Sequence, residues 1–179
     1  MVTTEICKII FKIFKWKILG EFSKVPKYII AVAPHTSFYD FFIGILVRNI
    51  INEKINFIGK KELFGPLTGW FFKILGGVPV DRNSKKNTVD SIVEIFNKRK
   101  KFKLAIAPEG TRKKVKKWKT GFYYIALKAK IPIMPVAFDY NNKSVVVHSL
   151  FYPSGNKEED FKKLYKKYKN VLNYRFDFN

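Results

Sequence analysis

Apolar residues follow two kinds of pattern along this chain, and each pattern predicts one kind of element. Short apolar runs bounded by Gly, Pro or Asn are typical of buried strands, whereas apolar residues three or four positions apart are typical of helices. The expected strands are residues 28–33, 55–59, 77–81, 104–107, 131–138 and 144–150. The expected helices are residues 40–47, 63–75, 87–101, 121–129 and 157–172, of which 63–75 is interrupted by Pro66 and Gly69 and should start irregularly. Strands that alternate with helices predict an α/β fold, here a single layered domain with a central mixed sheet flanked by helices.

The opening segment, residues 3–20, threads lysines through isoleucine, phenylalanine and tryptophan. Lys8, Lys12 and Lys15 share one face at helical spacing, so we expect a short amphipathic helix ahead of the layered domain. At a membrane interface the apolar residues, Trp16 included, would enter the acyl boundary and the lysines would contact anionic headgroups. The alternative is a first helix docked on the core with its lysines in water.

Composition limits the possible partners. The chain has 179 residues, of which 47% are hydrophobic, enough for one domain with its own core. Its formal net charge of +21 predicts anionic partners, namely nucleic acid, an acidic membrane surface or phosphorylated substrates. The clearly apolar charge-free runs, such as residues 28–39 and 63–72, are shorter than the ~20 residues of a membrane-spanning helix. We therefore expect a chain that lies on a bilayer rather than across it.

Metal and disulfide sites are not expected. Cys7 is the single cysteine, and His35 and His148 are the two histidines. One cysteine forms no internal disulfide, and two histidines are few for a histidine-based metal centre.

One histidine and one aspartate stand where a strand passes into a helix. His35 follows the apolar run 28–33, and Asp40 lies five positions later at the start of the next helix. A helix that begins with Ser37 as its N-cap leaves the His35 imidazole free to fold back onto the Asp40 carboxylate. The pair is then a general base in which the carboxylate fixes the imidazole tautomer and stabilises its cation. The alternative is a capping box, in which Asp40 binds only backbone N–H groups.

A second polar cluster follows the strand 104–107. In Pro108-Glu109-Gly110-Thr111-Arg112, Gly110 permits close backbone approach, Thr111 offers a hydroxyl and Arg112 can bind a phosphate, with Glu109 holding the guanidinium. Arg82, just past another expected strand, can reach the same pocket. The alternatives are a tight turn with a surface Glu/Arg pair and a solvated loop arginine.

In order along the chain, five stretches resemble the signature blocks of the 1-acylglycerol-3-phosphate acyltransferases and their glycerolipid acyltransferase relatives. The five stretches are His35 to Asp40, Lys60-Lys61-Glu62-Leu63, Gly76 to Arg82, Glu109-Gly110-Thr111-Arg112 and Ile131 to Val136. The likeness covers most of the chain. It departs from the family pattern at Lys113, which replaces a frequent serine and begins a basic run to Lys119; this run either contacts headgroups or is a solvated loop.

The resemblance implies transfer of a fatty acyl group from a thioester to the free sn-2 hydroxyl of a lysophosphatidate-like lipid, which gives phosphatidic acid for phospholipid synthesis. It implies His35 and Asp40 as the catalytic pair and Lys60 as an oxyanion-stabilising candidate. It implies a phosphate site of Arg82, Glu109, Gly110, Thr111 and Arg112. Residues 23–179 are then the acyltransferase domain, and residues 1–22 an interface helix.

The expected donor is acyl-CoA or an acyl carrier protein, with no bound cofactor and no metal. The expected location is peripheral or monotopic, on the cytoplasmic face of a membrane. Another lysolipid or a lyso-aminolipid as acceptor is an open alternative. So are two readings from other classes, a basic nucleic-acid-binding domain and a catalytically silent lipid-binding relative. The acyltransferase reading itself predicts no nucleic-acid partner.

Overall fold

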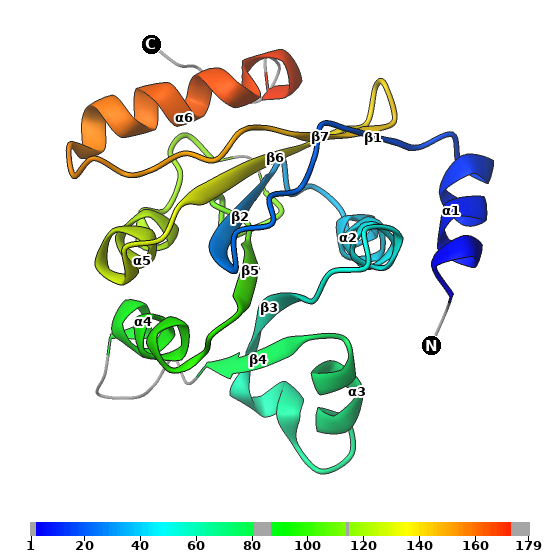
Figure 1. Ribbon diagram of the computed structural model, residues 1–179, viewed down its shortest axis with the longest axis horizontal. Coiled ribbons are helices and arrows are strands. Elements are labelled where there is room, and N and C mark those ends of the chain that lie inside the picture. Colours follow the sequence, from blue (N-terminus) through cyan, green and yellow to red (C-terminus); the bar gives the residue numbers. More distant parts are fainter. Residues whose placement is uncertain (1–2, 81–86, 114, 173–179) are drawn as a thin grey trace.

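One mixed sheet organises the chain in the computed structural model, which describes residues 3–80, 87–113 and 115–172 (Figure 1). The strand order is β1-β7-β6-β2-β5-β3-β4. Neighbouring strands run parallel except β6 and β7, which pair antiparallel. The strands are β1 (Lys17–Leu19), β2 (Lys27–Ala33), β3 (Ile55–Lys60), β4 (Gly77–Val80), β5 (Phe102–Ile106), β6 (Ile133–Asp139) and β7 (Ser144–Val147). The predicted α/β fold with a mixed central sheet is confirmed.

Helices cover both faces of this sheet. They are α1 (Thr4–Ile13), α2 (Tyr39–Ile50), the 3-10 turn η1 (Lys61–Phe64), α3 (Gly69–Ile74), α4 (Thr88–Lys98), α5 (Gly121–Ala129) and α6 (Lys157–Leu172). In Figure 1, α1, α2 and α3 lie on the right-hand side of the sheet, and α4 and α5 lie on its left. Arg48 near the end of α2 donates to the carbonyl of Leu75 just after α3, which fixes these two helices to each other.

The central strand β2 divides the core in two because successive side chains of a strand point to opposite faces. Ile29, Ala31 and Ala33 join the larger core, which packs against residues of α4, α5 and α6. Tyr28 and Ile30 join the smaller core, which packs against Phe11 of α1 and residues of α2. Burial on both faces explains why β2 reads in the sequence as a continuous apolar run.

The N-terminal segment differs from the prediction of one helix over residues 3–20. α1 ends at Ile13, and Lys15 adopts a positive φ of 59° that helical backbone does not allow. The chain then forms β1, which pairs with β7 and extends the sheet. The segment ends at Gly20, where only glycine fits. Its φ is +87°, and a Cβ there would stand 2.3 Å from the carbonyl oxygen of Val147.

Trp16 does not lie on an outer surface as predicted. Its ring packs against Phe11, Phe138 and Tyr140, with centroids 6.1, 6.5 and 5.3 Å away. α1 is docked on the core through Cys7 and Phe11, as in the alternative reading, while its remaining apolar residues stay exposed. Those exposed residues are Ile6, Ile9, Ile13 and Phe14.

The segment 63–75, predicted as a helix with an irregular start, consists of a 3-10 turn and a short helix separated at the predicted interruption. The turn η1 ends at Phe64, and α3 begins only at Gly69, after Gly65 and Pro66. Gly69 permits this folding back, because a Cβ at that position would stand 2.5 Å from the Phe64 carbonyl oxygen. The other predicted elements exist, with boundaries that differ from the prediction by at most three residues.

The parallel strands all end at the same edge of the sheet. β2, β3, β4, β5 and β6 run in one direction, so the segments that follow them meet at the carboxyl edge. This is the edge at which open α/β sheets bind ligands. Of the described residues singled out by sequence, His35 and Asp40 follow β2, Lys60 ends β3, and Glu109 to Arg112 follow β5, so their backbones share this edge.

Candidate active site

His35 and Asp40 are in direct contact. His35 Nδ1 lies 2.8 Å from Asp40 Oδ2. The Asp40 side chain is buried, whereas the His35 side chain keeps 32% of its surface exposed. The contact on Nδ1 leaves Nε2 on the opposite side of the ring for another proton partner.

Asp40 is also bound by the backbone that precedes its helix. Its Oδ2 accepts hydrogen bonds from the N–H groups of Thr36 at 2.7 Å and Ser37 at 3.0 Å. The capping interaction and the imidazole contact, weighed above as alternatives, therefore occur together on one carboxylate. The predicted N-cap is wrong by one residue: α2 starts after Phe38, and the Ser37 hydroxyl accepts from the Tyr39 N–H instead.

Tyr140 is a member of the site that the sequence analysis missed. It follows β6 directly, and its hydroxyl donates to Asp40 Oδ1, the oxygen that His35 does not touch. A tyrosine after a strand carries no motif, and only the sheet order, with β6 beside β2, places it next to Asp40. The one feature in the sequence that could have indicated Tyr140 is its position directly after a predicted strand. The sequence does not show that this strand lies beside β2.

These donors set the charge state of Asp40. Burial alone would raise its pKa, because a buried carboxylate loses solvation. Hydrogen bonds from His35, the Ser37 backbone, Tyr140 and the Thr36 backbone outweigh burial and hold the Asp40 pKa below its usual range. Asp40 is therefore an anion at neutral pH and stabilises positive charge on the imidazole.

Glu109 ties the second cluster to the first. Its side chain is buried, and Oε2 accepts a hydrogen bond of 2.5 Å from the backbone N–H of His35. This contact joins the loop after β5 to the loop after β2, at the point where the imidazole is attached. The predicted contact of Glu109 with Arg112 stays a prediction, and the contact with the His35 backbone is one that the sequence did not indicate.

The loop after Glu109 is closed at its base. Lys119 N donates to the Pro108 carbonyl at 2.8 Å, and Trp118, only 4% exposed, packs between Phe122 and residues of α6. Trp118 thus anchors the basic run rather than contacting headgroups. Gly110 has φ +64°, and a Cβ there would stand 2.7 Å from Lys119 Cδ, so the backbone turns tightly beneath that lysine.

The remaining predicted site residues are placed to different extents. Arg112 is exposed, and Thr111 is half-buried with its hydroxyl accepting from the Lys113 N–H. Lys60 is the last residue of β3 and pairs with Val80 of β4, which puts its backbone at the carboxyl edge. Arg82 lies outside the described residues. The roles of all four remain predictions.

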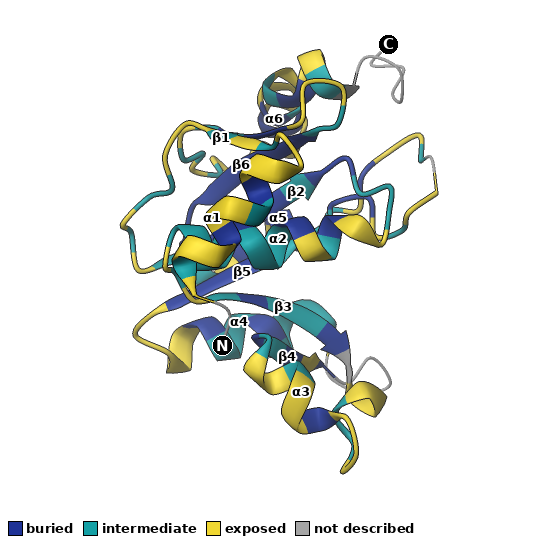
Figure 2. Cartoon of the chain, turned by 90° about the vertical axis from the view of Figure 1, so that its right-hand side faces the viewer, coloured by how far each residue is buried: buried dark blue, intermediate teal, exposed yellow. Residues whose placement is uncertain are grey.

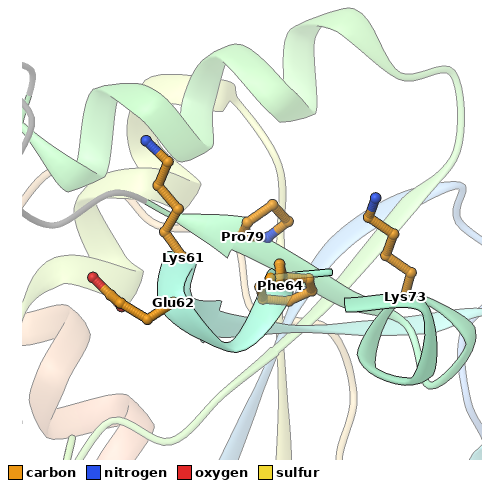
Figure 3. Close-up of a pocket in the computed structure, with 6 residues that line it drawn as sticks. Lys61, Glu62, Phe64, Lys73 and Pro79 are labelled. Atoms are coloured by element: carbon orange, nitrogen blue, oxygen red, sulfur yellow. The ribbon is translucent and has the colours of Figure 1, made fainter. Parts of the chain in front are cut away.

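A cavity of about 560 Å³ opens beside β4, at the end of the sheet (Figure 3). It is lined by Lys61, Glu62, Phe64, Gly65, Lys73 and Pro79. Neither His35 nor Asp40 lines this cavity. The strand β3, which precedes the lining residues, is separated from β2 by β5. At about 4.8 Å per strand, the end of β3 lies roughly 10 Å along the edge from the end of β2.

Neither a metal centre nor a membrane-spanning helix is found in the part of the chain that the structure describes. Within residues 3–80, 87–113 and 115–172, no group of three or more His, Cys, Asp and Glu side chains is arranged to hold a metal ion. Over the same residues, no helix is both long and apolar enough to cross a bilayer.

A family model described as Acyltransferase matches residues 18–139, a range that includes the His35–Asp40 pair and the Glu109 loop. The chain belongs to the acyltransferase family. Among curated proteins, the 1-acyl-sn-glycerol-3-phosphate acyltransferase of Escherichia coli (strain K12) is 30% identical over 127 residues, covering 68% of this chain and 51% of that protein. The 1-acyl-sn-glycerol-3-phosphate acyltransferase of Saccharomyces cerevisiae (strain ATCC 204508 / S288c) is 31% identical over 139 residues, covering 73% and 44%.

The chain spans about half the length of the curated relatives it matches. The crystal structure of the 1-acyl-sn-glycerophosphate (LPA) acyltransferase PlsC from Thermotoga maritima aligns over 97% of this chain and 79% of that chain. The TM-score is 0.64 at 21% sequence identity, which shows a shared fold.

We predict that Tyr140→Phe lowers kcat for acyl transfer about tenfold and leaves KM nearly unchanged, because a hydrogen bond to a charged group is lost while the ring stays against Trp16. Steady-state kinetics test this, with Tyr152→Phe, an exposed tyrosine after β7, as the matched control. A Tyr140→Phe enzyme with unchanged kcat would show that the hydroxyl does not position Asp40.

We also predict a pH-dependent loss of stability in Asp40→Asn. The folded-state pKa of Asp40 is depressed, so its stabilising contribution is complete above the unfolded pKa of about 4 and disappears as the pH falls through the lower folded value. Urea unfolding should show the variant less stable than wild type by about 2 kcal/mol at neutral pH, with the gap closing in acid. Asp90→Asn, which removes only the exposed partner of Lys128, is the control. A gap that is equal at neutral and acid pH would contradict the assignment.

Proposed function

We propose that this chain transfers a fatty acyl group from an acyl thioester to the free sn-2 hydroxyl of 1-acyl-glycerol-3-phosphate, which yields phosphatidic acid. Family membership and the activity for which both relatives are named support the reaction class and the acceptor. The observation that carries the proposal is the His35–Asp40 contact at the carboxyl edge, with the Glu109 loop bonded to the His35 backbone.

The chemistry begins with proton transfer. His35 Nε2 accepts the proton of the acceptor hydroxyl as its oxygen attacks the thioester carbonyl carbon and forms a C–O bond. The imidazolium is stabilised by the Asp40 carboxylate, a charge-assisted hydrogen bond in a mostly buried setting. Collapse of the tetrahedral intermediate breaks the C–S bond, and the imidazolium returns its proton to the departing thiolate. No covalent intermediate with the protein is required.

Anion recognition falls to the other predicted residues. Arg112 presents a guanidinium near the tight turn at Gly110, and Thr111 adds a hydroxyl, which together suit an acceptor phosphate. By the family resemblance, Arg82 joins this site and Lys60 stabilises the oxyanion that develops on the thioester oxygen. The end of β3 lies at the same edge as His35, which supports a place for Lys60 near the reacting atoms.

The donor and the location are further parts of the proposal. Acyl-CoA and an acyl carrier protein are both anionic, and a net charge of +21 favours association with either. We place the enzyme on the cytoplasmic face of a membrane, held at the surface rather than across it, where lysolipid acceptor and soluble donor meet.

His35→Ala should lower the rate of acyl transfer by about 10²-fold or more with the fold retained, because the general base is gone. The assay uses purified protein, 1-acyl-glycerol-3-phosphate and each donor, with circular dichroism as the check on folding. His148→Gln is the matched control: this second histidine follows β7 and lies near Tyr168 of α6. Turnover that survives in His35→Ala would overturn the assigned mechanism.

Arg112→Ala should raise KM for the phosphate-bearing acceptor about tenfold and change kcat little, since an arginine–phosphate contact contributes mainly to binding. A monoacylglycerol without phosphate should be used equally poorly by the variant and wild type. Lys117→Ala, in the same basic run and also exposed, is the control for a general loss of positive charge. An equal effect of the two substitutions would argue against a specific phosphate contact.

A further inference from the structure

Exposed apolar side chains gather on one side of the molecule. Among the described residues, every large apolar side chain that is exposed lies between residues 6 and 74, except Tyr124 and Tyr152. The elements concerned are α1, β1, the start of α2, η1 and α3. Figure 2 views the right-hand side of Figure 1 and shows exposed stretches on α1 and α3. A monomer in water rarely keeps so much apolar surface together without a partner.

The largest number of these exposed apolar side chains belongs to residues 61–76, the excursion between β3 and β4 that contains η1 and α3. We define the α3 patch as Leu63, Leu67, Trp70, Phe71 and Ile74. Leu67 is 89% exposed, and Trp70 and Ile74 are each 63% exposed. Other apolar residues of the excursion do pack inward: Phe64 contacts Phe72, with ring centroids 6.0 Å apart, and buried Gly69 sits against the Phe64 backbone. The excursion thus has an inner apolar side that holds it to the fold and an outer one that the fold does not use.

Positive charge borders this patch. Lys61 and Lys73 line the cavity beside β4, and Figure 3 shows both side chains rising on the same side of it, one on each side of Pro79, while Glu62 points another way. Apolar side chains flanked by lysines suit a bilayer in which acyl chains lie beneath anionic headgroups. A tryptophan at the rim suits the same place, since its amphipathic ring favours the headgroup level.

A line of aromatic rings connects the patch side of the sheet to the site. Phe38 and Phe42, both exposed in the first turn of α2 beside Asp40, contact each other with ring centroids 5.1 Å apart. Phe42 contacts Phe41, which packs on Phe57 of β3, the strand that continues into the excursion. A row of aromatic contacts therefore runs from the start of α2, beside Asp40, to β3, the strand that precedes the α3 patch in the chain.

We propose that the α3 patch is a membrane-docking surface, in which Leu67, Trp70, Phe71 and Ile74 enter the outer acyl region of an anionic phospholipid bilayer while Lys61 and Lys73 contact its phosphates. The proposal rests on the proposed function, since a lipid acceptor gives the site a reason to face a bilayer. It adds a second attachment point, formed by the catalytic fold itself, to the N-terminal helix α1.

The test measures attachment without turnover. Wild-type protein is sedimented with vesicles of phosphatidylcholine and phosphatidylglycerol that contain neither acceptor nor donor. Leu67→Glu/Ile74→Glu should reduce partitioning about tenfold or more, because two apolar side chains no longer enter the bilayer. Tyr124→Glu/Tyr152→Glu, which places the same charges on the other exposed apolar residues, is the matched control and should bind like wild type. Equal binding by all three proteins would overturn the proposal.

Tryptophan fluorescence reports where the contact occurs. Trp118 is buried and Trp16 is packed among three rings, so Trp70 is the tryptophan placed to respond. Vesicles with bromine-labelled acyl chains should quench the emission of wild type, and Trp70→Phe should abolish that part of the quenching. Bound protein without Trp70 quenching would overturn the proposal in favour of attachment by α1 alone.

The same variants separate this proposal from its alternatives. Acyl transfer to a short-chain, water-soluble lysophosphatidate should proceed normally in Leu67→Glu/Ile74→Glu, so a failure of docking and a failure of the proposed function give different results. Sedimentation equilibrium without vesicles tests whether the patch binds a second copy of the chain. If wild type is a dimer and the double variant is a monomer, the patch is an interface between two copies, which would contradict membrane docking.

Discussion

The arrangement of the site depends on one buried carboxylate. Asp40 accepts bonds from two backbone N–H groups at the entrance to α2, from the His35 imidazole and from the Tyr140 hydroxyl. Burying an ionised carboxylate is unfavourable unless such donors surround it. Here the donors come from the loop after β2 and the residue after β6, so satisfying the charge also fixes those segments relative to each other. Stability and the orientation of the His35 imidazole thus arise from the same contacts.

The sheet makes this convergence possible. Parallel strands deliver their carboxyl ends to one edge, and β2 lies between β5 and β6, which supply Glu109 and Tyr140. Successive apolar side chains of β2 enter the two cores in turn, so the strand is buried on both faces. Polar residues follow its end. The His35 side chain follows the end of β2 and is therefore positioned by the most buried strand of the fold. This position limits the movement of the imidazole.

The sequence was a good guide wherever a signal is local. Apolar runs and helical spacing located the main elements, and the His35–Asp40 and Glu109–Arg112 segments were found because their residues are close in sequence. What was missed depends on distant contacts. Lys17–Leu19 has no pattern that distinguishes three strand residues from the end of a helix, and pairing with β7 decides its form. Tyr140 lies 100 residues from Asp40, so strand order alone reveals it. Trp16 is a residue type typical of lipid interfaces, yet it is half-buried against three aromatic rings.

The place of Trp16 connects the N-terminal segment to the candidate site. Its ring meets Tyr140 edge-on at 5.3 Å, and the Tyr140 hydroxyl donates to the Asp40 carboxylate that contacts His35. The connection between α1 and β1 therefore reaches the His35–Asp40 pair through two side chains. A displacement of that connection would move the ring against which Tyr140 packs, and with it one of the donors that hold the carboxylate.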